Sequence, residues 1–328
     1  MPKKTLIAYQ ESWPIRGSFR ISRGAKTSAD VVVVEISDGV HTGRGECVPY
    51  PRYGESPSTV LDEISTVRGP ISHGATRQDI LSLMSSGAAR NAVDCALWDL
   101  EAKQTGRSVA DLAGIAESGP LITAFTLSLD TPEKMAAAAN LNAHRPLIKL
   151  KLGGEGDIER VAAVRKAAPK SRFIVDANEA WDFPMMERYF PAMADLGVEL
   201  IEQPLPAGQD DGLSDLVRPV PICADESCHD TSTLDQVAAN YDYINIKLDK
   251  TGGLTEALQM AEVARDFGLG IMVGCMLGTS LGMAPAMLLG GLARFVDLDG
   301  PLLLDKDRPN GIHFDESVMH PSTHELWG

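Results

Sequence analysis

The hydrophobic positions divide the chain into two parts with different periodicities. From Leu121 onward, short apolar runs typical of buried strands alternate with segments whose apolar residues recur at helical spacing. The strand-like segments are residues 121–129, 147–152, 172–176, 199–202, 220–225, 243–247, 270–274 and 294–299. The clearest helical segments are Pro132–Ala143, Asp157–Ala167, Pro184–Leu196, Thr231–Ala239 and Leu254–Phe267. Eight strands alternating with helices over about 200 residues predict a parallel β/α barrel.

The first part of the chain lacks this alternation. A β-branched run, Val31–Ile36, leads into Ser37–Gly39, which is typical of a hairpin turn. A segment rich in proline and glycine follows at 48–55, and Ala88–Lys103 has the apolar spacing of a helix. Strands followed by helices predict an α+β domain. We therefore divide the chain into an α+β domain at residues 1–115 and a barrel domain at 116–328, whose last part from Gly300 is an extended return segment.

The net charge of the chain limits the kinds of molecule that it can bind. The 328 residues carry a formal charge of −15, which repels nucleic acid and anionic membranes. A small anionic substrate remains compatible, because a local group of cations outweighs a distant field. The sequence leaves open whether the chain forms a homo-oligomer.

The cysteines and the apolar segments indicate a cytoplasmic protein. The five cysteines are odd in number and contain no CxxC pair, which is typical of buried thiols in a reducing compartment. No apolar run follows the basic start of the chain, so we expect no export signal. The stretch 267–293 carries no charge, but its seven glycines and Pro285 favour a buried β/α unit over a membrane span.

Charged residues recur at the ends of successive predicted barrel strands. They lie 22 to 26 residues apart, about one β/α unit. In chain order they are Lys149 and Lys151, Asp176, Glu202, Asp225 and Lys247. In a parallel barrel, these strand ends form the rim that carries the active site. The order predicts a three-carboxylate centre flanked by ammonium groups.

The three carboxylates predict a metal site. Asp176, Glu202 and Asp225 supply hard oxygen ligands, which suit Mg²⁺. Any one of them alone is better explained as a helix cap or as the partner of a surface lysine. Three at matching positions of consecutive units would repel one another without a cation, so together they favour the metal site.

The lysines predict acid–base chemistry. Lys149 and Lys151 are two residues apart in a strand and share a face, where adjacent ammonium groups lower each other's pKa. Lys247 comes from the opposite side of the barrel. A substrate between Lys151 and Lys247 can lose a proton on one face and regain it on the other. This arrangement favours racemisation or epimerisation, although elimination could use the same pair.

A pair of acids closes the series at the last strand. Asp297 and Asp299 also lie two residues apart on one face, and they would suit a substrate ammonium group. Neutralisation by Lys306 or Arg308 in the tail explains the spacing equally well.

These motifs together resemble the enolase superfamily, specifically its muconate-lactonising subgroup. The resemblance also rests on the segments 92–100, Asp249–Gly253 and Val273–Met276, and it covers almost the whole chain. It implies an α/β protein with a modified (β/α)7β TIM-type barrel and an N-terminal α+β capping domain. In that superfamily, lysine or histidine bases act with Mg²⁺ to stabilise an ene-diolate.

Within the subgroup, the Asp297–Asp299 pair resembles a signature of the dipeptide epimerases. The segments Pro49–Ser56 and Asp225–His229 are most similar to bacterial L-Ala-D/L-Glu epimerases, which act on a dipeptide from peptidoglycan turnover. The resemblance implies epimerisation of the C-terminal residue of a dipeptide, with Mg²⁺ as cofactor.

The resemblance also assigns roles to individual residues. It implies that Lys151 and Lys247 are the acid–base pair and that Lys149 polarises the substrate carboxylate. Asp176, Glu202 and Asp225 would bind Mg²⁺, and Asp297 and Asp299 would bind the dipeptide ammonium. The other implied substrate contacts are Thr126, Cys275, Leu277 and, for a glutamate side chain, Arg23, with Arg16, Arg20 and Arg52 as competitors for this last role.

Three other functions remain open at this point. A dipeptide epimerase with another side-chain preference has the same motifs. A lyase or cycloisomerase of the o-succinylbenzoate synthase or muconate cycloisomerase type would use the same lysines, but its substrate has no ammonium to pair with Asp297 and Asp299. The third is a non-catalytic protein that uses the barrel for ligand binding or as a scaffold, which failure to bind Mg²⁺ would favour.

Overall fold

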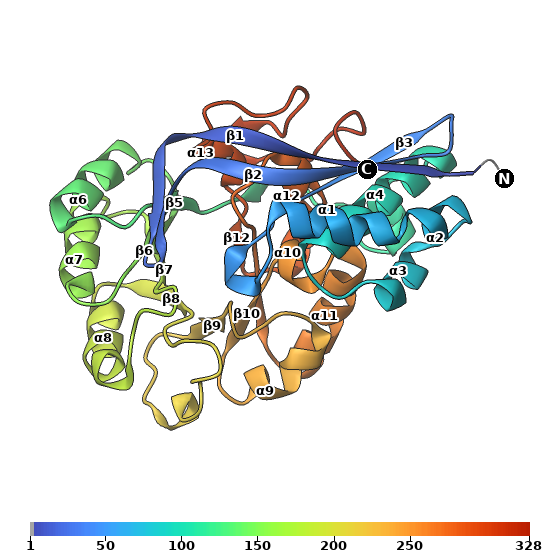
Figure 1. Ribbon diagram of the computed structural model, residues 1–328. Coiled ribbons are helices and arrows are strands. Elements are labelled where there is room, and N and C mark those ends of the chain that lie inside the picture. The colour runs from blue at the N-terminus through green and yellow to red at the C-terminus, as the bar shows by residue number, and fades with distance from the viewer. Residues whose placement is uncertain (1–2) are drawn as a thin grey trace.

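The computed structural model describes residues 3–328, so only the first two residues of the predicted capping domain lie outside it. Eight parallel strands form one sheet, drawn in the centre and left of Figure 1. Across the sheet, the strands run in the order β12 (Phe295–Asp297), β11 (Gly270–Gly274), β10 (Tyr243–Ile246), β9 (Ile222–Ala224), β8 (Val198–Glu202), β7 (Arg172–Asp176), β6 (Leu147–Lys151) and β5 (Phe125–Leu127).

Hydrogen bonds beside the two edge strands bring the sheet close to a closed barrel. The Ala124 N–H donates to Val296 O over 2.8 Å, and the Leu298 N–H donates to Thr123 Oγ1, also over 2.8 Å. These bonds connect the chain at the start of β5 to β12. The predicted parallel barrel is therefore confirmed.

Helices follow most strands and cover the outside of the barrel. The main ones are α6 (Pro132–Leu141), α7 (Asp157–Ala167), α8 (Phe183–Asp195), α9 (Leu234–Ala238), α11 (Leu254–Asp266) and α12 (Ser280–Met287). The predicted helices are thus confirmed within a few residues, except that Thr231–Thr233 forms a 3₁₀ turn before α9. Helix α8 begins where Asp182 accepts the Met185 N–H over 2.8 Å, with Pro184 in the first turn.

The alternation of side chains in β6 places its lysines inside the barrel. Ile148 and Leu150 belong to the hydrophobic core shared with the outer helices. Leu147 points the other way, into a small cluster with Ile174 and Leu200 that fills the end of the barrel remote from the rim. Since Lys149 and Lys151 share the face of Leu147, the sequence prediction of an inward lysine face is confirmed.

The first predicted barrel strand, 121–129, is wrong in one respect. It divides into β4 (Leu121–Ile122) and β5, because the intervening Thr123 N–H donates to Ser317 O over 2.9 Å. Strand β4 pairs with β14 (Val318–Met319), which forms a hairpin with β13 (Phe314–Asp315).

The C-terminal segment returns to the N-terminal part of the chain. After the short helix α13 (Gly300–Leu303) and the β13–β14 hairpin, the chain runs back to α4 (Ala88–Thr105). There the Trp327 indole N–H donates to Cys95 O over 3.0 Å, and Gly328 N–H donates to Asp99 over 2.8 Å. In Figure 1 the C-terminus accordingly lies beside the elements of the N-terminal part.

The N-terminal part contains a separate antiparallel sheet of β1 (Thr5–Ile21), β2 (Gly24–Ser37) and β3 (Thr42–Cys47). Helix α4 packs directly on β3: a Cβ added at Gly43 or Gly45 would lie 2.1 Å from a carbonyl oxygen of α4. Only glycine permits this approach. The remaining helices are α1 (Pro57–Thr66), α2 (Arg68–Ser72), α3 (Arg77–Leu83) and α5 (Val109–Ala113).

Strand β1 was not predicted from the sequence. Its residues are largely exposed, and the register with β2 shifts between Pro14 and Phe19, which breaks the alternation. The β1–β2 hairpin extends beyond the N-terminal helices, and its tip reaches the carboxyl ends of β6 and β7 (Figure 1). The hairpin therefore forms part of the wall of the site at this rim.

Among residues 3–328, no helix combines the length and apolarity needed to cross a bilayer. The cytoplasmic location and the possible homo-oligomer stay predictions.

Candidate active site

The structure brings the three predicted metal ligands together at the barrel rim. Asp176 and Glu202 are the last residues of β7 and β8, and Asp225 follows β9 directly. One oxygen from each carboxylate lies within 4.8 Å of the others, and all three residues are buried. A three-carboxylate set this close is suited to a divalent cation with hard-ligand preference.

In each carboxylate, one oxygen accepts a hydrogen bond from a group other than Lys149, Lys151 and Lys247. Asp176 Oδ1 accepts the Asn178 N–H over 2.9 Å, and Glu202 Oε1 accepts the Asn245 amide over 2.8 Å. Asp225 Oδ1 accepts from Lys250 Nζ over 2.6 Å. Within the described chain, Glu202 Oε2 has no hydrogen-bond donor, although Lys149 Nζ lies 2.6 Å away in a poorly directed charge contact. The second oxygens of Asp176 and Asp225 accept from Lys151 Nζ and Lys247 Nζ, both over 2.6 Å, so a cation bound through these oxygens would replace those two contacts.

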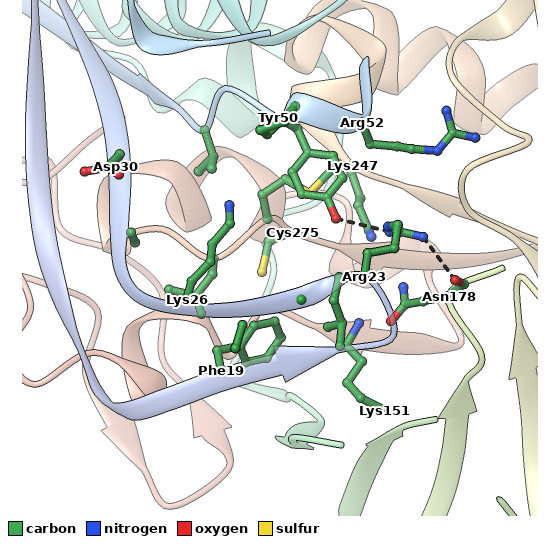
Figure 2. A pocket seen from close by; sticks show the side chains of 18 of the residues that line it. Phe19, Arg23, Lys26, Asp30, Tyr50, Arg52, Lys151, Asn178, Lys247 and Cys275 are labelled. Carbon is green, nitrogen blue, oxygen red and sulfur yellow. Dashed lines mark hydrogen bonds between the residues drawn. The ribbon is translucent and has the colours of Figure 1, made fainter. Parts of the chain in front are cut away.

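Three lysines surround these oxygens. Lys149 Nζ contacts Asp176, Glu202 and Asp297 at 3.2, 2.6 and 2.7 Å. Lys151 Nζ lies 2.6 Å from Asp176, and Lys247 Nζ lies 2.6 Å from Asp225. Since β6 and β10 are separated by three strands on either route around the sheet, Lys151 and Lys247 approach from opposite sides. Figure 2 shows both entering the same cavity.

Electrostatics at the site differ from the sequence expectation at Lys149. Burial alone would lower the pKa of this lysine, but Asp297, Glu202 and Asp176 outweigh burial and hold it well above the ordinary value. The lowered pKa expected from the neighbouring ammonium is therefore wrong for Lys149. Burial likewise opposes the charge of Lys247, and Asp225 and Glu202 raise its pKa.

The carboxylates are perturbed in opposite directions. Burial, together with the nearby Asp176 charge, raises the pKa of Glu202 to about 7. Burial also opposes ionisation of Asp225, but Lys247 and Lys250 hold its pKa well below the usual value. Such divergent pKa values within one cluster are typical of functional sites.

The two acids at the last strand are buried beside Lys149 and Thr126. Asp299 Oδ2 accepts the Thr126 N–H over 2.6 Å, while Asp297 pairs with Lys149. Burial and the Asp297 charge raise the pKa of Asp299 to about 7. Neutralisation from the tail is not found, because Arg308 pairs with Glu46 at 2.7 Å and Lys306 is exposed.

A cavity of about 430 Å³ lies between the rim and the N-terminal loops. Its lining on the barrel side includes Lys151, Lys247, Cys275 and Leu277. Thr126, Asp297 and Asp299 are not among its lining residues. On the other side, the wall comes from the β1–β2 hairpin and from the turn η1 (Pro51–Tyr53). The cavity is in the size range of small-molecule sites.

Arg23, which was predicted to bind a glutamate side chain of the substrate, is already paired with groups of the protein. Its guanidinium contacts Glu226 at 2.6 Å, Glu179 at 2.9 Å and the Tyr50 hydroxyl at 3.1 Å. Figure 2 shows this side chain reaching across to Asn178, whose carbonyl accepts a further hydrogen bond over 3.1 Å. Arg52, one of its competitors, pairs with Glu179 at 2.8 Å.

Lys26 lines the same cavity. It faces Phe19 in the β1–β2 ladder, and Ser28 and Asp30 follow it along the cavity wall at alternate positions of β2. Within residues 3–328, its ammonium forms no ion pair; the Tyr50 ring centroid lies 5.5 Å away. Burial lowers the pKa of Lys26, and Asp30 partly opposes this effect. Figure 2 shows the side chain pointing into the cavity beside Cys275.

Comparison with known proteins identifies the family. Residues 133–319 match the family model of enolase C-terminal domain-like proteins. Residues 3–114 match the N-terminal domain of mandelate racemase and muconate lactonizing enzyme. The chain belongs to the mandelate racemase/muconate lactonizing enzyme family of the enolase superfamily. The resemblance inferred from the sequence is therefore confirmed.

Relatives within this family have related names. The L-Ala-D/L-Glu epimerase of Escherichia coli is 44% identical over 97% of this chain and 99% of its own length. The N-acetyl-D-glutamate racemase of a Pseudoalteromonas species is 47% identical over 91% of this chain and 95% of its own.

Solved structures in the family agree closely with this fold. An Agrobacterium tumefaciens enolase family member with homology to dipeptide epimerases, bound to sodium and L-Ala-L-Glu, has a TM-score of 0.98, 53% identity and coverage of 99% of this chain and 100% of its own. The Enterococcus faecalis dipeptide epimerase, complexed with Mg and L-Leu-L-Tyr, has a TM-score of 0.91 and 28% identity, covering 100% of this chain and 99% of its own.

The sequence reasoning missed several residues of this family site. Lys26 could have been found from the alternation 26, 28, 30 if the β1–β2 hairpin had been recognised. Lys250 lies inside the Asp249–Gly253 segment, which contributes to the family resemblance but carries no strand-end signal for this lysine. Glu179 and Glu226, which pair with Arg23, gave no signal in spacing, because each lies beyond the end of its strand.

Proposed function

We propose that the protein is a Mg²⁺-dependent dipeptide epimerase that inverts the α-carbon of the C-terminal residue. The observation that carries this proposal is the placement of Lys151 and Lys247 on opposite sides of one cavity, above three clustered carboxylates. The names and bound dipeptides of the relatives support the substrate class.

Each group of the site has a role in this proposal. Asp176, Glu202 and Asp225 hold Mg²⁺, and the cation supplies electrostatic stabilisation of negative charge on the substrate carboxylate. Lys149 adds a fixed positive charge at the same carboxylate. Lys151 and Lys247 abstract and return the α-proton from opposite faces. Asp297 and Asp299, close to Lys149, receive the dipeptide ammonium.

We propose L-Ala-D/L-Glu as the substrate. Lys26 and Arg23 place two cations at the hairpin side of the cavity, where the side chain of the C-terminal residue would lie. Lys26 is the better reader of a glutamate carboxylate, because the charge of Arg23 is matched by Glu226 and Glu179. Dipeptides with other side chains remain the nearest alternative.

A second candidate function follows from the Pseudoalteromonas relative. An N-acetylglutamate substrate has the same carboxylates as the dipeptide but lacks the ammonium group. The buried acids Asp297 and Asp299 favour the dipeptide, because its ammonium can form an ion pair with these carboxyl groups and a neutral acetyl group cannot.

Proton exchange in D₂O tests the proposal. Purified protein with Mg²⁺ and L-Ala-L-Glu is expected to lose the glutamate α-proton NMR signal as the L,D diastereomer grows. N-acetyl-L-glutamate, L-Ala-L-Gln and L-Leu-L-Tyr are run in parallel. Exchange only with N-acetylglutamate would replace the dipeptide by the second candidate, and exchange with none would contradict racemisation and epimerisation and favour a lyase.

The two-base assignment has its own test. Lys151→Ala and Lys247→Ala are each expected to lose epimerisation, with a rate decrease of roughly 10²–10⁴-fold or more. Each variant is expected to retain α-proton exchange with only one of the two diastereomers, and the two variants with opposite ones. If both variants lost exchange with the same diastereomer, the opposite-face arrangement would be wrong.

A further inference from the structure

Lys250 is a buried lysine at the metal cluster that does not reach the substrate cavity. It lies in the short helix α10 (Leu248–Thr251), which follows β10, and its side chain has no exposed surface. An ammonium has three N–H groups. Those of Lys250 reach Asp225 Oδ1 and Asp225 O, both at 2.6 Å, and Asn245 O at 3.0 Å. These three hydrogen bonds therefore hold the Lys250 ammonium in place.

The two oxygens of Asp225 are bonded to different lysines. Oδ1 accepts from Lys250, which is buried and does not line the cavity, whereas Oδ2 accepts over 2.6 Å from Lys247, which lines the cavity. A cation entering from the cavity can therefore replace the Lys247 contact at Oδ2 but not the Lys250 contact at Oδ1. The same division occurs at Glu202, where Asn245 holds Oε1. Each of these carboxylates can therefore offer one ligand oxygen, not two.

This restriction bears on the choice between Mg²⁺ and Ca²⁺. Mg²⁺ takes six oxygens in near-ideal octahedral geometry and keeps several waters. Ca²⁺ takes six to eight oxygens and readily accepts bidentate carboxylates. A site that offers three single oxygens suits the smaller ion, and a site with bidentate carboxylates suits the larger one.

We propose that Lys250 is a positioning residue that sets the metal selectivity of the site. By holding Oδ1 of Asp225, it keeps this carboxylate monodentate and disfavours Ca²⁺. Asn245 does the same for Glu202. The inference rests on the proposed role of the three carboxylates as metal ligands.

A role in charge balance alone predicts a different result. Removing a buried cation would change the affinities for Mg²⁺ and Ca²⁺ in the same direction, since both ions carry the same charge. The ratio of the two affinities cancels this shared effect. The ratio therefore reports on the number of ligand oxygens.

The test is calorimetric titration of wild type and Lys250→Met with Mg²⁺ and, separately, with Ca²⁺. We expect Mg²⁺ affinity to fall roughly 10–100-fold, as for other residues that orient metal ligands. We expect Ca²⁺ affinity to fall less or to rise, so that the Mg²⁺/Ca²⁺ ratio drops by about tenfold or more. Lys306→Met, the same change at an exposed residue, controls for the loss of a lysine.

A second variant keeps the test decisive if Lys250→Met does not fold, as judged by circular dichroism. Asn245→Leu releases Glu202 Oε1 and is expected to shift the ratio in the same direction. An unchanged ratio in the folded variants would overturn the selectivity role, even with Mg²⁺ bound normally by wild type. Failure of wild type to bind Mg²⁺ would instead overturn the proposed metal site.

Discussion

At the scale of single residues, two cations of the β1–β2 hairpin differ in what surrounds them. Arg23 is held by Glu226, Glu179 and Tyr50, so a substrate carboxylate would have to compete with two protein carboxylates. Lys26 faces the cavity without an ion pair among residues 3–328. Its burial leaves a partly desolvated charge, which gains most from an anionic ligand.

Replacing Lys26 should therefore alter substrate preference. Lys26→Met is expected to lower kcat/KM for L-Ala-L-Glu relative to L-Ala-L-Gln, because a hydrogen bond to a charged group contributes about 1.5–3 kcal/mol. This corresponds to roughly 10–100-fold in the ratio. Lys170→Met, at an exposed position, is the matched control. An unchanged ratio in Lys26→Met, with a reduced ratio in Arg23→Met, would restore Arg23 as the reader.

At the scale of elements, one carboxylate connects two loops of the N-terminal part to the barrel. Glu179 follows β7 and pairs with Arg23 of the β1–β2 turn at 2.9 Å and with Arg52 of η1 at 2.8 Å. Asn178 and Glu179 have φ angles of +46° and +67°, in the left-handed region that is unfavourable for most residues. This turn directs the Asn178 N–H to Asp176 and the Glu179 side chain to the two loops. One short segment therefore contacts both the carboxylate cluster and the loops of the cavity wall.

Neutralising Glu179 should loosen both loops. Glu179→Gln keeps a carbonyl oxygen for the Ala207 N–H but removes both ion pairs. We expect kcat/KM to fall about 5–30-fold, equivalent to one or two kcal/mol, and trypsin to cut faster after Arg23 and Arg52. The control is Glu155→Gln, which removes an exposed ion pair with Arg188. Equal trypsin cleavage of wild type and Glu179→Gln would show that other contacts close the loops.

Some elements of this fold can be predicted from the sequence and others cannot. The barrel and its charged rim were predictable, because every strand is a short buried run and ends at the same edge. Strand β1 was not predictable, since it is exposed and its register shifts after Pro14. Lys250 could not be singled out from the sequence, because it lies in the short helix α10 and not at a strand end, where the other charged residues of the rim recur.

At the scale of the whole molecule, buried polar groups join the N-terminal part to the barrel. Asp249, at the start of α10, accepts the Val48 N–H over 3.0 Å and the Asn91 amide over 2.8 Å. Arg90 of α4 donates to Thr251 O over 2.6 Å. Because the η1 loop that lines the cavity follows β3 and precedes α4, these bonds also fix the two ends of the segment that carries this loop.

The carboxyl of Asp249 should make stability depend on pH. Burial, only partly offset by the two hydrogen bonds, raises its pKa from 3.8 to about 7. Between these values the unfolded chain releases this proton before the folded chain does. The unfolded state then binds fewer protons, so the free energy of unfolding falls as pH rises from about 4 to about 7. Below this window Asp249 does not lower the free energy of unfolding, and above it the loss of free energy no longer changes with pH.

Asp249→Asn removes this titration while keeping an oxygen for both donors. Its gain in unfolding free energy over wild type is expected to be small near pH 4 and to grow to as much as about 4 kcal/mol above pH 7. Urea unfolding of both proteins across this range measures the difference, in which titrations common to both cancel. Asp235→Asn, at an exposed position, is the matched control. If the difference between Asp249→Asn and wild type stayed constant with pH, Asp249 would be ionised in the folded protein throughout, and the bonds to Val48 and Asn91 would outweigh its burial.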